Sequence, residues 1–425
     1  MPVFPPFLPD AVKKQVNCIM GLGHIRNDDR GIKGMKKVIA ALMTAVMVLG
    51  ITSCKKDLKT KTNIENEISK LQTVDGNIWI NFDKEYENMV NVLLYQVQET
   101  DLRGSLIVAT DDEVIFASGT GLLDNDGNEV SLYTTYEIGS ITKSFTAVSI
   151  MKLVQEGKVS LDDTLEKYFP EYSDCAYYDR TSKVTISNML HMRSGIPDYV
   201  NEPTLFFDAE TIMNALGYDA EFMSEESIVH QLYNSVDDDT IMRSVFSCRP
   251  NNEPDTEFQY SNTNYFILAV ILERVTGRSY EEYLTEEIFE PCGMKDTTSM
   301  SFGDVTASIK YDAWYTEPCQ TKGCGDIHST VVDLLRYDRA LFGGYLLNDK
   351  TMEEFFYQID GYACGFFKEK EDLINHGGST HGFHTENYVI ERNGKHLYII
   401  MFANQKENTA FMIYKYLNPL FESED

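Results

Sequence analysis

The stretch that follows Ser140 constrains the fold more than any other, because it predicts a helix that is apolar on every side. It reads ITKSFTAVSIMKLVQEGKV, and its isoleucine, phenylalanine, alanine, valine, methionine and leucine residues surround the helix axis almost completely. A helix without a polar face has to be buried. Gly157 supplies the stop at its C-terminal end. We therefore expect a central helix with the rest of the chain packed around it.

Strand patterns lie at both ends of the globular part. Two short apolar runs, 105–110 and 113–118, predict one β-hairpin. A second pair of runs, 385–392 and 396–404, flanks Asn393–Gly394, the dipeptide most typical of a type I′ turn. The two hairpins together predict one antiparallel sheet built from N- and C-terminal strands.

Helical patterns occupy the region between the hairpins and one segment before them. Apolar periodicity predicts these helices over 83–98, 185–191, 263–290 and 328–343, and the third of them pauses at Gly277. The order of elements predicts an α/β (α+β) fold, in which helices flank the antiparallel sheet and a mainly helical region is inserted into it.

The N-terminal region carries targeting signals rather than fold signals. After Met35 two lysines precede an apolar stretch, 38–51, which is shorter than the roughly 20 residues of a membrane helix. It ends in ITSC, which resembles a bacterial lipobox and implies cleavage before Cys54 and lipidation of that residue; a plain signal peptide or a buried helix are the alternatives. We expect an over-extended gene start at 1–34, a lipoprotein signal peptide at 35–53, a tether at 54–82 and the globular domain at 83–425.

Net charge and cysteine content limit which ligands and cross-links can be expected. The net charge of −29 argues against nucleic acid and against a polybasic hold on anionic lipid. Beyond Cys18 and Cys54, six cysteines remain, and either disulfides or free buried thiols fit them. Cys319 and Cys324 are close enough in sequence to bridge a loop. No two Cys-x-x-Cys pairs occur, so no zinc site is expected.

Ser140 and Lys143 are the first candidate catalytic pair. Residues three apart share one face of a helix, so the hydroxyl and the amine can come within hydrogen-bond reach. A serine becomes a good nucleophile only when a base takes its proton. A lysine can be that base where burial or the positive end of a helix favours its uncharged amine. The same helix end would aim a backbone N–H at an oxyanion. Ser-x-x-Lys also arises by chance, so the pair alone does not fix a function.

Two further stretches carry chemistry-bearing residues. In FQYSNTNY, Tyr260 and Asn262 precede a predicted helix and can point the same way, which places a phenol beside an amide; the alternative is a helix cap by Ser261 or Asn262. In NHGGSTHGFH, His376 is followed by two glycines that let the backbone approach a ligand closely. The histidine spacing fits no compact metal site, and we expect no metal.

These motifs resemble the serine β-lactamase/penicillin-binding-protein superfamily. Ser140–Lys143, Tyr260–Asn262 and His376–Gly378 stand in its order and at its distances, and the similarity is closest to the class C-like branch of β-lactamases, D-alanyl-D-alanine carboxypeptidases, D-aminopeptidases and esterases. Further segments look like family segments, namely 156–172, 184–199, 272–297 and 325–341.

The resemblance implies an acyl-enzyme mechanism without metal or organic cofactor. Ser140 would attack a carbonyl, and Lys143 and Tyr260 would accept its proton and return it to the leaving group. The N–H groups of Ser140 and Ser379, with Gly378 beside them, would form the oxyanion hole. Asn262 would hold the amide of the acyl side chain.

The third motif departs from the family pattern, which is Lys-Thr-Gly in the well-known lactamases. His376 offers less charge to a substrate carboxylate than lysine does, and Gly377 offers no hydroxyl. We therefore expect a serine hydrolase acting on an ester or amide, of esterase, D-aminopeptidase or DD-carboxypeptidase type, with weak β-lactamase activity as one possibility.

The alternative function is a non-turnover penicillin-binding or sensing lipoprotein of the envelope. The expected setting is the bacterial cell envelope, with a lipid anchor at Cys54, a small-molecule or peptide substrate, no nucleic acid and a monomeric state.

Overall fold

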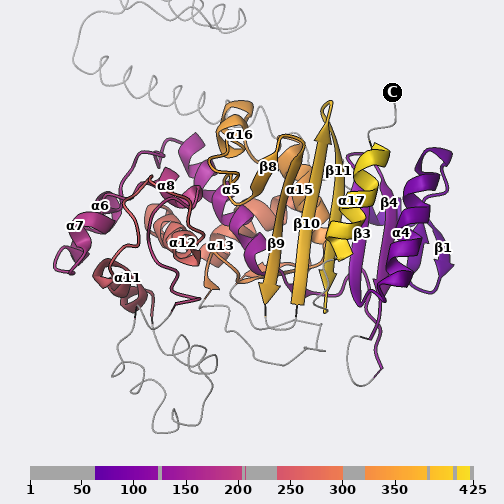
Figure 1. The fold of residues 1–425 in the computed structure, drawn as a ribbon, viewed down its shortest axis with the longest axis horizontal. Helices are drawn as coiled ribbons and strands as arrows, with labels where there is room; N and C mark the ends of the chain where they lie inside the picture. Colours follow the sequence, from indigo (N-terminus) through magenta and orange to yellow (C-terminus); the bar gives the residue numbers. More distant parts are fainter. Residues whose placement is uncertain are drawn as a thin grey trace, which may run out of the picture. The chain divides into compact units, whose positions relative to one another are not determined.

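An eight-stranded antiparallel sheet joins the two ends of the chain, as the computed structural model shows (Figure 1). The structure describes residues 63–122, 127–202, 206, 237–299, 321–380, 383–404 and 409–421, all within the compact unit Leu58–Asp425. The strand order is β1-β2-β4-β3-β11-β10-β9-β8. The strands are β1 Gln72–Asp75, β2 Ile78–Ile80, β3 Gly104–Thr110, β4 Val114–Thr120, β8 Phe367–Lys370, β9 Leu373–Thr380, β10 Phe383–Arg392 and β11 Lys395–Ala403.

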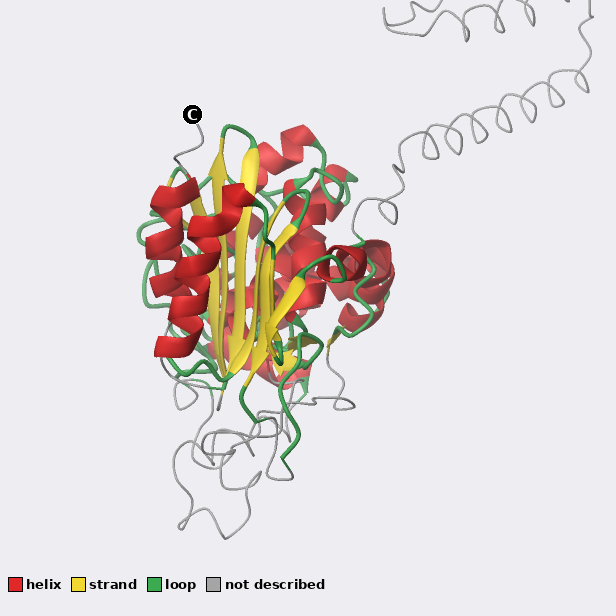
Figure 2. Ribbon diagram, turned by 90° about the vertical axis from the view of Figure 1, so that its right-hand side faces the viewer, coloured by secondary structure: helices red, strands yellow, loops and turns green. Residues whose placement is uncertain are grey.

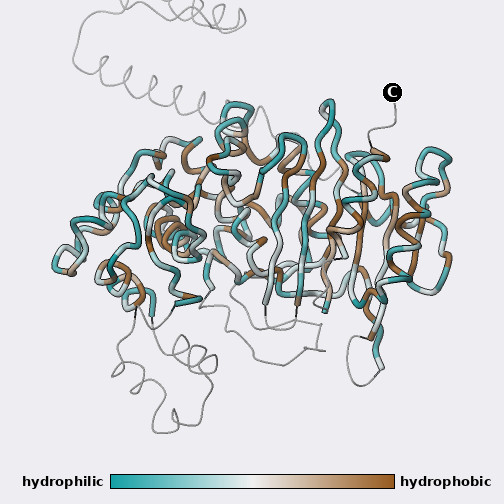
Figure 3. Tube along the Cα trace, in the orientation of Figure 1, coloured by the Kyte–Doolittle hydropathy of each residue, from teal (hydrophilic) through white to brown (hydrophobic). Residues whose placement is uncertain are grey.

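Helices cover both faces of this sheet. Helices α4 (Glu87–Glu99) and α17 (Thr409–Phe421) pack side by side on one face, and the central helices lie on the other (Figure 2). Alternate residues of each strand face opposite layers. On β3, for example, Leu106 and Val108 pack beneath α4 and α17, whereas Ile107 and Ala109 pack toward the central helices. Figure 3 shows the apolar stretches along the sheet and these helices.

Both predicted hairpins are present. Strands β3 and β4 pair directly, and β10 pairs with β11 over its whole length. Asn393 and Gly394 both have positive φ, 52° and 74°, as a type I′ turn requires. The pairing of β3 with β11 closes the sheet between the two ends of the chain, which confirms the predicted architecture.

The predicted tether differs from the structure over its described part. Residues 63–80 form helix α3 (Ile64–Ile68) and the hairpin of β1 and β2, which extends the sheet beside β4. The physical reason is burial of Ile64, Ile78 and Ile80 against the core, with a turn at Gly76, whose φ is positive. The proposed gene start, the signal peptide and Cys54 lie outside the described residues.

The central helix is α5 (Thr142–Gln155), and it is buried on all sides as predicted. Its residues from Thr142 to Met151 are all buried, the polar ones included. The predicted helical segment 263–290 is present, with its pause at Gly277, which adopts a left-handed conformation and ends α12 (Asn262–Thr276). The second part begins as α13 (Tyr280–Leu284) and continues through η8 (Thr285–Phe289) and α14 (Glu290–Cys292).

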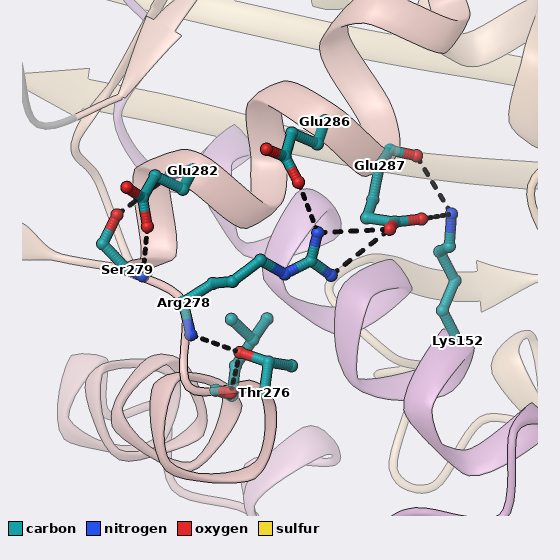
Figure 4. Close-up of polar contacts among 8 residues, drawn as sticks. Lys152, Thr276, Arg278, Ser279, Glu282, Glu286 and Glu287 are labelled. Carbon is teal, nitrogen blue, oxygen red and sulfur yellow. Dashed lines mark hydrogen bonds and ion pairs between the residues drawn. The ribbon is translucent and has the colours of Figure 1, made fainter.

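A polar network fastens α5 to the segment after Gly277 (Figure 4). Glu287 lies 3.1 Å from the ammonium of Lys152 on α5, and it also pairs with Arg278. Arg278 reaches Glu286 as well, and Ser279 and Glu282 form a capping box at the start of α13. These contacts hold the C-terminal half of α5 in place, far along the helix from Ser140.

A small second sheet and several further helices complete the described part of the chain. A second, three-stranded sheet has the order β5-β7-β6. Of the described helices, α15 confirms the prediction at 328–343 and is capped by Thr330, and α8 confirms that at 185–191. The bounds are β5 Tyr136–Glu137, β6 Thr298–Ser299, β7 Ile327–Ser329, η3 Lys84–Tyr86, η4 Gly139–Ile141, η5 Pro170–Tyr172, η8 Thr285–Phe289, α6 Leu165–Tyr168, α7 Tyr178–Thr181, α8 Ile186–Leu190, α11 Asp238–Ser247, α14 Glu290–Cys292, α15 Val331–Phe342 and α16 Asp349–Phe355.

The described residues show the state of the cysteines and the hydrophobic length of the helices. The five described cysteines, Cys175, Cys248, Cys292, Cys324 and Cys364, are free thiols; Cys319 lies outside the described residues. Within the same part of the chain, no helix is both long enough and apolar enough to span a bilayer.

Candidate active site

Ser140 sits in the single turn η4 that leads into α5, where strand β9 packs against it. Gly139 has a φ of +53°, a conformation that favours glycine. A Cβ at Gly139 would lie 3.2 Å from Cα of Gly378 and 3.2 Å from the backbone nitrogen of Ser379. The sequence Gly-Ser therefore brings the half-buried hydroxyl of Ser140 next to the strand that was predicted to supply an oxyanion donor.

Lys143 is fully buried and its amine makes three contacts. Its Nζ lies 2.9 Å from Ser140 Oγ, 2.7 Å from Asn262 Oδ1 and 2.8 Å from the backbone carbonyl oxygen of Cys324. The last two atoms are carbonyl oxygens, which can only accept hydrogen bonds. They therefore hold two N–H groups of the amine, and the third direction of the nitrogen points at Ser140. In this direction a charged ammonium donates to Ser140 Oγ, whereas the amine, once it has lost a proton, would present its lone pair to the serine hydroxyl.

The carbonyl of Cys324 is fixed by a loop that is clamped to α5. Thr146 on α5 donates to the carbonyl of Gly323 at 2.7 Å, and the N–H of Gly323 donates to Asp326 at 2.7 Å. Asp326 is fully buried, and burial raises the pKa of its carboxyl to about 6. Burial likewise raises the pKa of the Cys324 thiol to about 12, so the thiol stays protonated.

Asn262 is oriented by Asp198, a buried carboxylate. The amide of Asn262 donates from Nδ2 to Asp198 Oδ2 at 2.9 Å. Asp198 also accepts from the N–H of Val200 at 3.0 Å and from the side chain of Asn201 at 2.7 Å. Because a carboxylate only accepts hydrogen bonds, the amide nitrogen of Asn262 must face Asp198 and its oxygen must face Lys143. One N–H of this amide is thus engaged with Asp198, and the expectation that Asn262 also holds the amide of the acyl side chain stays a prediction.

Tyr260 lies beside the amine within a group of aromatic rings. Nζ of Lys143 is 5.0 Å from the centroid of the Tyr260 ring, close enough for a cation–π interaction. The ring contacts those of Tyr362, Phe367 and His376, with centroids 6.2–6.3 Å apart. The half-buried ring of Tyr260 therefore lies near both Lys143 and His376 of the third motif.

His376 reaches the site from β9 as an uncharged ring. Its Nδ1 donates to the carbonyl of Gly377 at 2.7 Å, so its Nε2 accepts from the hydroxyl of Tyr362 at 3.3 Å. Burial, and then the charge of Lys143, lower the pKa of His376 to about 3. The sequence predicted a partly charged histidine here, and the structure places a neutral one.

The two glycines of the third motif have different neighbours. A Cβ at Gly378 would lie 2.0 Å from the carbonyl oxygen of Ile138 and 2.4 Å from Oγ1 of Thr385, so glycine is required for β9 to approach η4. A Cβ at Gly377 would lie 2.9–3.1 Å from the carboxyl group of Glu386, its direct partner on β10. We expected the glycines to admit a ligand; in the structure they admit these protein groups.

The structure brings Ser140, Lys143, Tyr260, Asn262 and the His376–Ser379 segment together around one amine and one strand. Three contributors were missed. Asp198 lies in the segment 184–199, whose family resemblance gave it no stated role. The Cys324 carbonyl is a backbone group, so the residue type at this position does not indicate its role. Glu386 needs the strand register to be placed opposite Gly377.

Curated relatives share the sequence over different lengths. The chain is 24% identical over 388 residues to a putative penicillin-binding protein, PbpX, of Bacillus subtilis, covering 86% of this chain and 85% of the relative. It is 30% identical over 224 residues to Protein flp of Staphylococcus aureus, covering 52% of this chain and 39% of the relative. The match to Protein flp thus spans well under half the length of that relative.

Solved structures share the fold. D-amino acid amidase from Ochrobactrum anthropi SV3 has a TM-score of 0.59 at 21% identity, covering 79% of this chain and 98% of the amidase. The penicillin binding protein from Bacillus halodurans has a TM-score of 0.59 at 21% identity, covering 77% of this chain and 99% of that chain. The mixed architecture, with its large antiparallel sheet between helices, is therefore shared with penicillin-binding-protein-like neighbours. The family model described as Beta-lactamase matches residues 96–419, and the chain belongs to the β-lactamase family.

Proposed function

We propose that this protein is a serine hydrolase that cleaves an ester or amide through an acyl-enzyme on Ser140. The observation that carries the proposal is the fully buried amine of Lys143, held by two carbonyl oxygens and directed at the hydroxyl of Ser140. A nucleophile paired with an oriented base is the general signature of covalent catalysis. Membership of the β-lactamase family supports a hydrolase function, and so does the fold that this chain shares with a D-amino acid amidase.

In the proposed acylation, Ser140 attacks the substrate carbonyl and the leaving group departs with a proton. Lys143 takes the proton of Ser140 as Oγ bonds to the substrate carbonyl carbon, and the carbonyl oxygen becomes an oxyanion. The N–H groups of Ser140 and Ser379 stabilise that oxyanion. The carbon–oxygen or carbon–nitrogen bond of the leaving group then breaks, and Lys143 returns the proton to the departing atom. Tyr260 lies where its ring stabilises the ammonium that forms in between.

Deacylation uses water in place of the serine hydroxyl. Lys143 takes a proton from water as the hydroxide bonds to the acyl carbon, and the bond between that carbon and Ser140 breaks. Oγ of Ser140 recovers its proton from Lys143, and the acid product leaves. No group outside this chain and water is required. Under this proposal the enzyme acts in the bacterial envelope, where a lipidated Cys54 would anchor it.

Labelling of the nucleophile tests the proposal directly. We expect a fluorophosphonate probe to modify Ser140, with mass spectrometry locating the adduct. Ser140→Ala should abolish the adduct and lower turnover of a 4-nitrophenyl ester by at least about 10³-fold. Ser173→Ala, which changes an exposed serine, should behave as the wild type.

Two outcomes would change the proposal. Undiminished turnover in Ser140→Ala would overturn it. A stable acyl-enzyme that forms without steady-state turnover across esters, D-amino-acid amides, D-alanyl-D-alanine peptides and nitrocefin would favour the non-turnover penicillin-binding or sensing function instead.

A further inference from the structure

Helix α5 holds two consecutive carbonyl groups of the loop 321–326. Lys143 donates to the carbonyl of Cys324 at 2.8 Å. Thr146, three residues further along and therefore on the same face of the helix, donates to the carbonyl of Gly323 at 2.7 Å. The proposed mechanism uses only the first of these contacts. The second fixes the peptide group directly before the one that holds the lysine.

The hydroxyl of Tyr280 on α13 gives this second contact its direction. Its oxygen lies 2.6 Å from Oγ1 of Thr146, and both side chains are fully buried. A carbonyl oxygen only accepts, so the single hydrogen of Thr146 is directed at Gly323, and the hydrogen between the two hydroxyls comes from Tyr280. Burial raises the pKa of the Tyr280 phenol well above its usual range, so this hydrogen is retained. The two hydroxyls therefore form a hydroxyl pair that donates in one direction, toward the loop.

Tyr280 is also joined to the loop at a second point. Its backbone N–H donates to Oε1 of Glu273 at 2.9 Å, and Oε2 of Glu273 lies 3.2 Å from the ammonium of Lys322. Lys322 directly precedes Gly323 in the loop. The side chain of one loop residue and the carbonyl of the next are thus both tied to Tyr280, which restricts rotation of the loop.

The same loop packs directly on α12. A Cβ at Gly323 would lie 2.6 Å from Cβ of Ala269 and 2.7 Å from the carbonyl oxygen of Tyr265. This backbone contact does not depend on either hydroxyl. Loss of one hydroxyl should therefore change the direction of the loop carbonyls rather than detach the loop.

We infer that Thr146 and Tyr280 are positioning residues for Lys143. Their hydroxyl pair sets the direction of the loop carbonyls, and the carbonyl of Cys324 in turn holds the amine against Ser140. A base that is displaced from its hydrogen-bond distance slows proton transfer without weakening substrate binding. The inference rests on the proposed hydrolase function and adds two residues to its machinery.

Variants of Thr146 test the role of its hydroxyl. Thr146→Val replaces the hydroxyl by a methyl group of similar size. We expect kcat for a 4-nitrophenyl ester to fall at least about tenfold, with KM within about threefold of the wild type. The rate of fluorophosphonate labelling at Ser140 should fall in parallel. Thr146→Ser keeps the donor and should retain kcat within about threefold of the wild type.

A double-mutant cycle tests whether the two hydroxyls act as a pair. Tyr280→Phe in the otherwise unchanged protein should lower kcat at least about threefold. In the Thr146→Val background, the same change should alter kcat by less than about twofold, because the contact through which it acts is already lost. Two independent structural effects would multiply instead.

Two matched controls remove buried hydroxyls outside the pair. Tyr283→Phe changes a buried tyrosine of α13 whose hydroxyl has no hydrogen-bond partner among the described residues. Ser149→Ala changes a buried serine of α5 that donates to the carbonyl of Phe145 in its own helix. Both should keep the wild-type kcat. If Thr146→Val does not fold, as judged by circular dichroism, the comparison of Tyr280→Phe with Tyr283→Phe decides.

The outcomes separate this inference from the function on which it rests. Four results overturn the positioning role and leave the hydrolase intact: wild-type kcat in folded Thr146→Val, equal kcat in Tyr280→Phe and Tyr283→Phe, a change in KM alone, or effects that multiply in the double variant. Loss of activity in Thr146→Ser as large as in Thr146→Val overturns it as well. Absence of both Ser140 labelling and ester turnover in the wild type overturns the hydrolase function, and the positioning role with it.

Discussion

The orientation of the Asn262 amide determines which of its atoms faces Lys143. Its oxygen holds Lys143 only because its nitrogen is held by Asp198. Without that carboxylate, the amide could rotate and turn its nitrogen toward the lysine, where two donors would face each other. Asp198 is thus a positioning residue, which acts on Ser140 through Asn262 and Lys143.

Substitution of Asp198 should slow catalysis more than it weakens substrate binding. A hydrogen bond to a charged group contributes about 1.5–3 kcal/mol, which corresponds to about 10–100-fold in rate. We expect Asp198→Ala to lower kcat by this factor with KM within about threefold of the wild type, measured by steady-state hydrolysis. Asp198→Asn keeps an oxygen acceptor and should retain more activity than the alanine variant.

The matched control is Asp179→Ala, which removes an exposed carboxylate and should leave kcat unchanged. A rise in KM with an unchanged kcat in Asp198→Ala would mean that Asp198 contacts substrate rather than positioning the base.

At the scale of elements, the site depends on how closely β9 approaches η4. Gly378 and Gly139 face each other at the crossing, and the hydroxyl of Thr385 on β10 donates to the carbonyl of Ile138 at 2.9 Å. The same hydroxyl lies 3.3 Å from the carbonyl oxygen of Gly378 on β9, so it helps to hold β9, and with it the N–H of Ser379, near the serine. A side chain at either glycine would separate the two elements.

Gly378→Ala should therefore damage both stability and activity. Its Cβ would overlap the Ile138 carbonyl oxygen, 2.0 Å away, so the strand has to move. Overpacking of this kind costs about 1–3 kcal/mol, and displacing one oxyanion donor costs about 10²–10³ in kcat. Thermal unfolding and the rate of fluorophosphonate labelling measure the two effects.

Glu391→Ala, an exposed change on the neighbouring strand, provides the comparison. Wild-type labelling kinetics in Gly378→Ala would contradict the role given to the crossing.

Features that local sequence patterns encode were predicted, and features that depend on tertiary contacts were not. The central helix, both hairpins and the Ser140–Lys143 pair were predicted because short-range patterns encode them. Strand β1 was missed because all four of its residues are exposed and lack an apolar alternation. The Cys324 carbonyl and the pairing of Glu386 with Gly377 depend on tertiary backbone positions, which a local pattern does not contain.

At the scale of the whole molecule, a buried acid joins the sheet to the helical layer. Asp338 on α15 accepts from the amide of Asn387 on β10 at 3.0 Å. Asp338 Oδ2 and Asn387 Oδ1 find no partner among the described residues. Burial raises the pKa of Asp338 to about 8, so its carboxyl carries a proton at neutral pH. That proton can link the two remaining oxygens and complete a paired acid and amide.

The stability of the fold should consequently depend on pH through Asp338. The folded state holds the proton up to about pH 8, whereas an unfolded aspartate releases it near pH 4. The stabilisation is therefore full below about pH 4 and is lost as pH rises through about 8. Asp338→Asn keeps the paired geometry and has no proton to lose, so its Tm relative to the wild type should rise by several degrees from pH 5 to pH 9.

Differential scanning calorimetry across that pH range measures the difference. Asp162→Asn, at an exposed position, should track the wild type. Parallel pH curves for Asp338→Asn and the wild type would show that the buried carboxyl does not titrate in this way.

The pairing of β3 with β11 also sets the time at which the proposed active site can form. Leu106 lies opposite Met401, so the sheet closes only after the last strands have left the ribosome. Until then Ser140 and Lys143, which lie earlier in the chain, lack the closed sheet that contains β9. Under the proposed function, we therefore expect Ser140 to stay inactive until β11 has paired with β3.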